Sequence, residues 1–254
     1  TKCGEFAIEV VATAEDPFES EIVGLAFATN VGETSYIPVK SPDGNHIASK
    51  IVFEILGNIF NDSSIKKILH NSNFPMTILS IAGAGLQGLV FDTLLASHFV
   101  GRKAMDLSSL VLECFQEELP TDKDFWGTGR SRVQPDQMPI QDVANYYCQK
   151  SAYIIKLRDV IEKELSDKGI FEAFINMEMK LAPVIVKMQC DGLSIDSAML
   201  TEMSAELADT MNHIESSMYQ LVGHEFNLNS SQQLGGILFD ELRLPKTKKN
   251  QKGY

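Results

Sequence analysis

The sequence has no run of about eighteen consecutive apolar residues, which excludes a hydrophobic transmembrane helix of ordinary length. Its first residues, Thr1 to Gly4, also lack an initiator Met and the apolar stretch of a signal peptide. Neither end has the features of a natural terminus. We therefore expect a fragment of a longer cytoplasmic protein that has no contact with a membrane.

Closely spaced cysteines are missing as well. The four that are present lie far apart and form no C-x-x-C pair: Cys3, Cys114, Cys148 and Cys190. Structural zinc sites and disulfide frameworks need clustered cysteines or an extracellular context, so neither is expected. We predict reduced and mostly buried thiols, as in a cytoplasmic protein.

An excess of basic residues is absent, because 34 acidic residues outnumber 22 basic ones and the formal net charge is -12. Phosphate binding depends on Lys and Arg, so this balance argues against a protein that binds nucleic acid over its whole surface. One acid-free stretch, residues 243–252, differs. It holds the basic residues Arg243, Lys246, Lys248, Lys249 and Lys252. Binding to DNA is therefore expected at one place only.

The apolar fraction of 44% is enough for a core, and 22% charged residues argue against disorder. Three runs rich in β-branched and aromatic residues, 5–11, 21–29 and 34–39, predict three consecutive antiparallel strands. Segments with apolar residues at helical spacing then alternate with short apolar runs that are typical of strands. We expect a helix at 47–60, a strand at 64–72, a helix at 76–85, a strand at 88–93, and helices at 92–100 and 106–116. This order predicts an α/β fold, a mixed sheet flanked by helices, over residues 1–165.

Residues 117–139 form a predicted loop rich in Gly, Pro, Asp and Arg. A loop of that length in a compact domain is usually functional or mobile. Helix is expected again over 139–165, with Pro139 in its first turn. A further helix is expected over 170–190, with a kink at Pro183.

A long amphipathic helix follows, with Asp196 as its expected N-cap and Gly223 as its end. Apolar residues recur along it every three or four positions and include several Met, which is typical of a packing stripe rather than a cofactor site. Ser230 and Gln233 then stand at capping-box spacing where another helix begins. We predict an all-α segment, residues 170–254, appended to the α/β domain.

Four segments of the chain carry a resemblance to a known family. GHEFNLNSSQQLGGILFDELRLPKTKKNQKGY (223–254) and MQCDGLSIDSAMLTEM (188–203) are similar to the thumb tip and the thumb entry of family A DNA polymerases of the bacterial DNA polymerase I type. GLAFATNVGETSYIPV (24–39) and GLQGLVFDTLLASHFVG (85–101) are similar to the 3′–5′ exonuclease domain of that family. The resemblance covers nearly all of the chain. It implies that the α/β domain is ribonuclease-H-like and that the all-α segment is the first part of a thumb.

The resemblance also implies a proofreading site built from four metal-binding carboxylates, most of which are missing here. The first motif of the family is D-x-E on the first strand, where this chain has Glu9 and Val11. The second motif is an Asp after N-x-x-(F/Y), and here Asn71 and Phe74 are followed by Pro75. Two of these three carboxylates are therefore replaced by side chains that cannot bind a metal ion.

The third motif, Y-x-x-x-D on a late helix, keeps Tyr147 but has Ser151 in place of Asp. Only Glu9 remains acidic among the four positions. Two divalent cations about 4 Å apart would have to activate water and stabilise the leaving oxygen, and hard cations need several oxygen ligands. Aligning the second and third motifs one residue out of register does not supply the missing acids, because the neighbouring residues are Met76 and Lys150. We predict an inactive, structural exonuclease-like domain without a metal or a cofactor.

The thumb is expected to bind duplex primer–template DNA in a parent DNA-directed DNA polymerase of replication or repair. The nucleic-acid-binding residues predicted for it are Asn229, Ser230, Gln233, Arg243, Lys246, Lys248, Lys249 and Lys252. Palm and fingers are absent from this sequence, and in the parent they would carry out Mg²⁺-dependent synthesis. The fragment is predicted to be a monomer and to contact the rest of the polymerase chain. By itself it is expected neither to synthesise DNA nor to proofread.

Two other functions stay open. An active 3′–5′ exonuclease could have an atypical metal site that recruits Glu9, Glu15 or Asp16. A free-standing interaction module is disfavoured, because the long helix would have no second helical layer to pack on. Palm motifs in a continuation after Tyr254 would identify the parent.

The remaining polar candidates favour structural roles. Asp92 fits a helix N-cap better than a metal ligand. The stretch GTGRSR (127–132) resembles a phosphate-binding loop only superficially, because it neither follows a strand nor opens a helix with Lys-Ser/Thr. The histidines lack the partners of a catalytic residue and are expected in the core or on the surface: His70, His98, His213 and His224.

Overall fold

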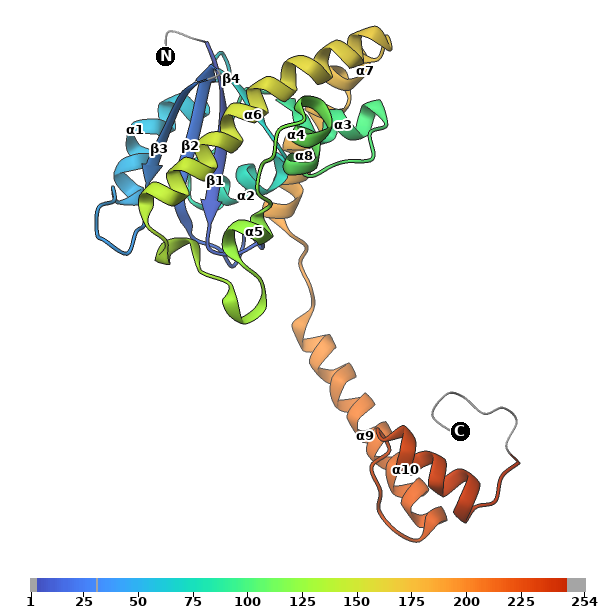
Figure 1. The fold of residues 1–254 in the computed structure, drawn as a ribbon. Helices are drawn as coiled ribbons and strands as arrows, with labels where there is room; N and C mark the ends of the chain where they lie inside the picture. The colour runs from blue at the N-terminus through green and yellow to red at the C-terminus, as the bar shows by residue number, and fades with distance from the viewer. Residues whose placement is uncertain (1–3, 31, 246–254) are drawn as a thin grey trace. The chain divides into compact units, whose positions relative to one another are not determined.

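A computed structural model describes residues 4–30 and 32–245, which form two compact units (Figure 1). Unit 1 spans Thr1–Gly192 and unit 2 spans Leu193–Tyr254. Within the described residues, no helix has both the length and the apolar character that crossing a membrane requires.

Unit 1 combines five strands with eight α-helices in its described residues. The strands are β1 (Glu5–Ala12), β2 (Ile22–Asn30), β3 (Glu33–Pro38), β4 (Lys66–Leu69) and β5 (Leu89–Asp92). The helices are α1 (Ser49–Asn61), α2 (Asn73–Ile81), α3 (Thr93–Val100), α4 (Leu107–Phe115), α5 (Asp122–Trp126), α6 (Ile140–Asp167), α7 (Phe171–Asn176) and α8 (Glu178–Asp191).

The five strands form one mixed sheet in the order β3-β2-β1-β4-β5. The β1–β2 and β2–β3 pairs are antiparallel, whereas β1–β4 and β4–β5 are parallel. In this register Glu9 of β1 lies opposite Ala26 of β2, and Ala7 lies opposite Ile68 of β4. The predicted α/β class with a mixed sheet and flanking helices is confirmed.

Side chains on β1 alternate between two hydrophobic layers, as the period of two in a strand requires. Ala7 and Val11 pack with α6, which runs across one face of the sheet (Figure 1). Ile8 and Val10 belong to the other layer, which includes residues of α1 and α2. Both faces of the central strand are therefore buried, and each fully buried Val or Ile stabilises the fold by about 1.5–3 kcal/mol.

The helix ends follow local capping chemistry. Asp92 begins α3, and its side chain accepts from the backbone N–H groups of Leu94 and Leu95. Asp106 caps α4 in the same way, through the N–H of Ser109. The predicted N-cap role of Asp92 is confirmed, because a carboxylate at this position satisfies amides that no helical carbonyl reaches.

Two expectations for the middle of the chain were wrong. Residues 117–139 are not a plain loop, because they contain α5, which a capping box between Thr121 and Asp124 stabilises. The single helix expected over 170–190 is two helices, which break at Met177 and not at Pro183. Pro183 lies inside α8, so the proline removes one backbone hydrogen bond without ending the helix.

Helix α8 packs against α2 and so belongs to unit 1, which for this reason extends to Gly192. Gln189 of α8 accepts hydrogen bonds from Asn73 Nδ2 at 2.8 Å and from Thr77 Oγ1 at 3.3 Å, both on α2. Val186 adds a buried apolar contact with the same layer. The compact unit thus ends later than residue 165, while the functional boundary between exonuclease-like domain and thumb stays a prediction.

Unit 2 contains α9 (Ser197–Val222) and α10 (Ser231–Gly236), which continues into a π-helical turn, Ile237–Glu241. Asp196 caps α9 through the N–H of Met199, and Gly223 ends it in the left-handed conformation. Both ends agree with the prediction. The apolar stripe of α9, which includes Met203, remains exposed along the helix.

The described cysteines are free thiols: Cys114 and Cys148 are half-buried and Cys190 is exposed. The expectation of mostly buried thiols was therefore wrong for the three cysteines that the structure describes, because none of them is fully buried. Cys3 lies outside the described residues.

Candidate functional site at the ends of strands β1 and β4

A cleft of about 540 Å³ lies where Glu9, Pro75 and Tyr147 meet, which come from the three segments compared above with exonuclease motifs. Strands β1 and β4 run parallel, so their carboxyl ends reach the same edge of the sheet. Residues of the chain after β1, the turn after β4, α5 and α6 close the cleft. Its lining includes Glu9, His70, Asn71, Phe74, Pro75, Asp122, Trp126, Arg132, Tyr147 and Lys150.

The centre of the cleft is an ion pair between Glu9 and Lys150. The Nζ atom of Lys150 lies 3.6 Å from Oε2 of Glu9, and the two side chains are only 11% and 12% exposed. The same Nζ donates to Oδ1 of Asp122 at 3.1 Å. An ammonium group therefore bridges two carboxylates that come from β1 and from the start of α5.

Two tyrosines of α6 surround the ammonium of Lys150. Its Nζ lies 4.9 Å from the ring centroid of Tyr147 and 5.5 Å from that of Tyr146, within the range of cation–π attraction. Tyr146 also donates its hydroxyl to Oδ1 of Asp122 at 2.9 Å. The tyrosines stand three and four residues before Lys150, so all three side chains lie along one stripe of the helix.

The charges at this site shift each other's protonation. Burial by itself lowers the pKa of Lys150, but Glu9, Tyr147 and Asp122 outweigh it, so the pKa is raised above its ordinary value. Burial raises the pKa of Glu9, and the Lys150 ammonium opposes that shift. Lys150 therefore remains a cation at neutral pH and is the positive charge of the cleft.

Val11 and Ser151, two of the positions at which the family motifs predict a carboxylate, lie in the core and not at the cleft surface. Val11 is 0% exposed and packs in the layer between the sheet and α6. Ser151 is also 0% exposed, and its hydroxyl donates to the carbonyl oxygen of Tyr147 at 2.9 Å. Pro75 lies in the first turn of α2 and lines the cleft without offering a ligand.

His70 lines the cleft, and the buried Asp92 behind it fixes the turn after β4. Besides capping α3, Asp92 accepts from the backbone N–H groups of Asn71 at 3.1 Å and Ser72 at 2.5 Å. The Nδ1 atom of His70 lies 2.9 Å from Oγ1 of Thr93. Burial lowers the pKa of His70 to about 4, which keeps its imidazole neutral at pH 7.

The two acids that an atypical site was expected to recruit are held elsewhere. Glu15 lines the cleft, but its side chain is 90% exposed and lies 3.5 Å from Arg132. Asp16 accepts from the N–H of Phe18 in a surface turn. Neither acid is directed at the carboxylate of Glu9.

The residues of the cleft do not fit a two-metal centre. Within residues 4–30 and 32–245, no three His, Cys, Asp or Glu side chains group so that they could hold a metal ion. The two carboxylates that do approach each other, Glu9 and Asp122, are bound to the same ammonium. The donor set here is therefore matched to a lysine and not to a pair of hard cations.

Sequence reasoning missed two residues that define this site, Asp122 and Lys150. They stand 28 positions apart and meet only because α5 folds back against α6. The capping pattern of Thr121 and Asp124 could have revealed α5 and placed Asp122 in its first turn. Lys150 had drawn attention only as the neighbour of the missing aspartate.

The other histidines and the glycine-rich stretch have structural surroundings. His98 and His213 are exposed, and His224 Nε2 pairs with Glu241 Oε2 at 3.0 Å. Residues 127–132 follow α5 and contain a short 3₁₀ turn, so no strand precedes them as a phosphate-binding loop would need.

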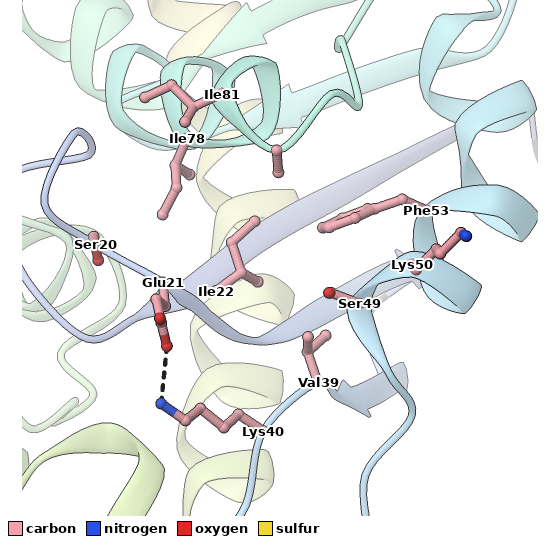
Figure 2. Close-up of a pocket in the computed structure, with 11 residues that line it drawn as sticks. Ser20, Glu21, Ile22, Val39, Lys40, Ser49, Lys50, Phe53, Ile78 and Ile81 are labelled. Atoms are coloured by element: carbon pink, nitrogen blue, oxygen red, sulfur yellow. Dashed lines mark hydrogen bonds and ion pairs between the residues drawn. The ribbon is translucent and has the colours of Figure 1, made fainter.

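A second hollow, of about 630 Å³, lies apart from the cleft, between β2, the start of α1 and the end of α2 (Figure 2). Phe53, Ile78 and Ile81 contribute apolar surface, and Lys40 forms an ion pair with Glu21 at 2.9 Å. None of the predicted site residues lines it.

The predicted nucleic-acid-binding residues of unit 2 lie in and beyond the turn after α9. Asn229 donates its N–H to Asn227 Oδ1, and Ser230 accepts from the N–H of Gln233 as N-cap of α10. The expected capping box is only half formed, because Gln233 Oε1 accepts from the N–H of Asn227 at 2.8 Å and not from that of Ser230.

The basic cluster lies at the edge of what the structure describes. Arg243 is exposed and has a positive φ of 54°. Lys246, Lys248, Lys249 and Lys252 lie outside the described residues. Binding of DNA by this cluster stays a prediction.

Comparison with known proteins places the chain in a family. A family model described as the ribonuclease H-like domain of DNA polymerase I matches residues 8–157, more than half of the chain. The chain belongs to the DNA polymerase I family. A second model, DNA polymerase family A, matches residues 197–254.

Curated relatives agree with this assignment to the DNA polymerase I family. The chain is 30% identical over 250 residues to DNA polymerase I of Geobacillus stearothermophilus, covering 98% of this chain and 27% of the relative. It is 28% identical over 240 residues to DNA polymerase I of Chloroflexus aurantiacus, covering 93% of this chain and 25% of the relative. The chain thus spans about a quarter of the length of these curated relatives.

Two solved structures share the fold. One is described as the POL domain of Pol1 from M. smegmatis in complex with DNA primer-template and dNTP, with a TM-score of 0.70 and 24% identity over 100% of this chain and 40% of that one. The other is NrnC of Brucella melitensis, with a TM-score of 0.60 and 18% identity over 77% of this chain and 90% of that one.

Proposed function

We propose that this chain is part of a DNA-directed DNA polymerase in which unit 1 is an inactive exonuclease-like domain and unit 2 begins the DNA-binding thumb. One observation carries the proposal for unit 1. The charged partner of Glu9 in the cleft is the ammonium of Lys150, 3.6 Å away, where a proofreading site would need further acidic ligands.

The chemistry explains why this arrangement is incompatible with hydrolysis. Cleavage by two metal ions needs a nucleophilic water and a stabilised leaving oxygen, each bound to its own cation. A Mg²⁺ ion requires oxygen ligands in near-octahedral geometry. Val11, Pro75 and Ser151 provide no carboxylate at the family positions, and Lys150 adds a positive charge that opposes the entry of a cation.

The role left for unit 1 is structural. Its two hydrophobic layers bury both faces of the sheet, and α8 continues from this core toward the residues that match the polymerase family. A domain of this kind would support the rest of the polymerase chain without reacting with DNA. In the parent protein, which we propose to be a monomer, Mg²⁺ would act in the palm and not in this domain.

A nuclease assay tests the proposal for unit 1. A 5′-labelled single-stranded oligonucleotide is incubated with the 254-residue chain and with Mg²⁺ or Mn²⁺, and no shortening is expected. A Glu9→Ala variant is assayed in parallel. Metal-dependent shortening that disappears in Glu9→Ala would overturn the proposal in favour of an active exonuclease with an atypical metal site.

Binding of duplex DNA is proposed for unit 2, through the turn at Asn229 and the basic residues from Arg243 onward. The side chains of Ser230 and Gln233 and the backbone N–H of Asn229 form hydrogen bonds that shape the turn before α10, ahead of the basic cluster. Lys and Arg can contact phosphates without distinguishing bases. Binding should therefore be non-specific in sequence and sensitive to salt.

A further inference from the structure

Lys150 is a buried cation whose role the loss of nuclease chemistry does not explain. Lysine is rarely buried unless its charge is paired, because removing an ammonium group from water is costly. The Lys150 side chain is only 11% exposed. Burial of this ammonium therefore depends on the acids that it contacts, Glu9 and Asp122.

Lys150 and its two acidic partners come from three separate parts of unit 1. Glu9 belongs to β1, Asp122 begins α5, and Lys150 lies in the first half of α6. Tyr146, on the same helix as Lys150, also donates to Asp122 at 2.9 Å, which ties Asp122 to α6 through a second contact. Without a cation between them, the two negative charges would repel each other.

Two carboxylates that converge on one positive charge are also a common arrangement for a divalent cation. Mg²⁺ in proteins is often held by one or two carboxylates, with water completing its coordination. Here the central position holds an ammonium, 3.1 Å from Asp122 and 3.6 Å from Glu9. The ammonium satisfies the same two acids without needing further ligands.

We propose that the Lys150 ammonium takes the place of a divalent cation between Glu9 and Asp122. The cleft of the natural chain then binds neither Mg²⁺ nor Mn²⁺, whereas a variant without this ammonium gains a weak divalent-cation site. Lys150 is a positioning residue that holds α5 against β1 and α6. This inference rests on the proposed inactivity of the cleft, and it names the group that occupies the position of the metal ion.

The test compares metal binding and stability of the natural chain with those of Lys150→Met. Mn²⁺ binding is measured by electron paramagnetic resonance, and unfolding of unit 1 is followed by the fluorescence of Trp126, the only tryptophan. In the absence of metal, Lys150→Met should melt on the order of 5–10 °C lower, as expected when a buried pair loses one partner. Millimolar Mn²⁺ should raise the melting temperature of Lys150→Met and leave that of the natural chain unchanged.

Two controls separate the cation role from ordinary packing. Lys156 is also on α6, with its Nζ 4.8 Å from the ring of Tyr153 and 3.6 Å from Glu117, but outside the cleft. Lys156→Met should gain no response to Mn²⁺. The triple variant Lys150→Met/Glu9→Gln/Asp122→Asn should lose the response as well, and it should melt at a higher temperature than Lys150→Met without metal.

A further variant keeps the test decisive if Lys150→Met does not fold. Lys150→Gln preserves a long polar side chain without the charge, and it should show the same gain of Mn²⁺ binding. Binding of Mn²⁺ by the natural chain at this cleft, or no binding in any folded variant that lacks the charge, would overturn the inference. The second result would leave the proposed inactivity untouched, since that proposal is decided by the nuclease assay alone.

Discussion

The hydroxyl of Ser151 donates a hydrogen bond to the backbone carbonyl of Tyr147, one helical turn earlier, at 2.9 Å. At this position the family motif has an aspartate that would face a metal ion. The serine hydroxyl is instead hydrogen-bonded within its own helix, and the residue is 0% exposed. Its neighbour Lys150 pairs with Glu9 at 3.6 Å. On two consecutive residues of α6, one side chain is therefore bound within the helix and the other carries a cation into the cleft.

Restoring acids at Val11 and Ser151 is not expected to restore cleavage. Both positions are 0% exposed and lie beside a site whose positive charge Lys150 already provides, so new carboxylates would pair with the ammonium or remain buried without a partner. The Val11→Glu/Ser151→Asp variant should melt at a lower temperature than the natural chain and show no Mg²⁺-dependent shortening of a labelled oligonucleotide. Efficient shortening would mean that the cleft is less altered than we infer.

Asp92 should contribute more to stability than an ordinary helix cap. It is 0% exposed and accepts from four backbone N–H groups, those of Asn71, Ser72, Leu94 and Leu95. Asp92→Ala would leave these donors without a partner, and we expect a loss of at least about 3 kcal/mol in urea unfolding followed by Trp126 fluorescence.

The matched control for Asp92 is the exposed N-cap Asp106, which accepts from the N–H of Ser109 at 2.9 Å. Asp106→Ala should cost only about 1 kcal/mol, the usual value for an N-cap. Equal losses in the two variants would show that the contacts of Asp92 to the turn after β4 contribute nothing.

His70 should make unit 1 less stable in mild acid. Its pKa is lowered by burial to about 4 in the folded chain, against about 6.5 when unfolded. Between these values the unfolded state binds more protons, so this residue's contribution is complete above pH 6.5 and is lost as the pH falls toward 4. The loss is at most on the order of 3 kcal/mol.

The measurement is the melting temperature of unit 1 between pH 7 and pH 4 for the natural chain and for His70→Gln. The natural chain should lose more stability over this range than the variant. His46→Gln, which changes an exposed histidine, should leave the pH dependence as it is. Parallel curves for the natural chain and His70→Gln would contradict the assigned role of burial.

The basic cluster should contribute most of the affinity for duplex DNA. Replacing Lys246, Lys248 and Lys249 with Ala should weaken binding of a labelled primer–template in fluorescence anisotropy. The slope of log affinity against log salt should fall by up to about one unit for each lost phosphate contact. The triple variant of the exposed lysines Lys50, Lys66 and Lys163 is the control. An unchanged slope after the first triple replacement would leave the cluster without a role in binding.

Features governed by neighbours in sequence were predictable. The first three strands were found from β-branched runs, and Asp92, Asp196 and Gly223 were recognised as helix ends because capping depends on groups only a few residues away. The break at Met177 was not found. It arises because Phe174 packs against Phe91 while α8 packs against α2, a demand of tertiary contacts.

The sequence by itself determined the family, the succession of strands and helices along the chain, and which residues stand at the four positions compared with the family motifs, because each is a matter of which residue stands at which position. Only the tertiary structure decided what replaced them. Asp122 and Lys150 are 28 residues apart, and Glu9 lies on a strand far from both. Their meeting depends on how α5 and α6 pack on β1, and a Coulombic contact that needs separations of 3 to 4 Å cannot be inferred before that packing is known.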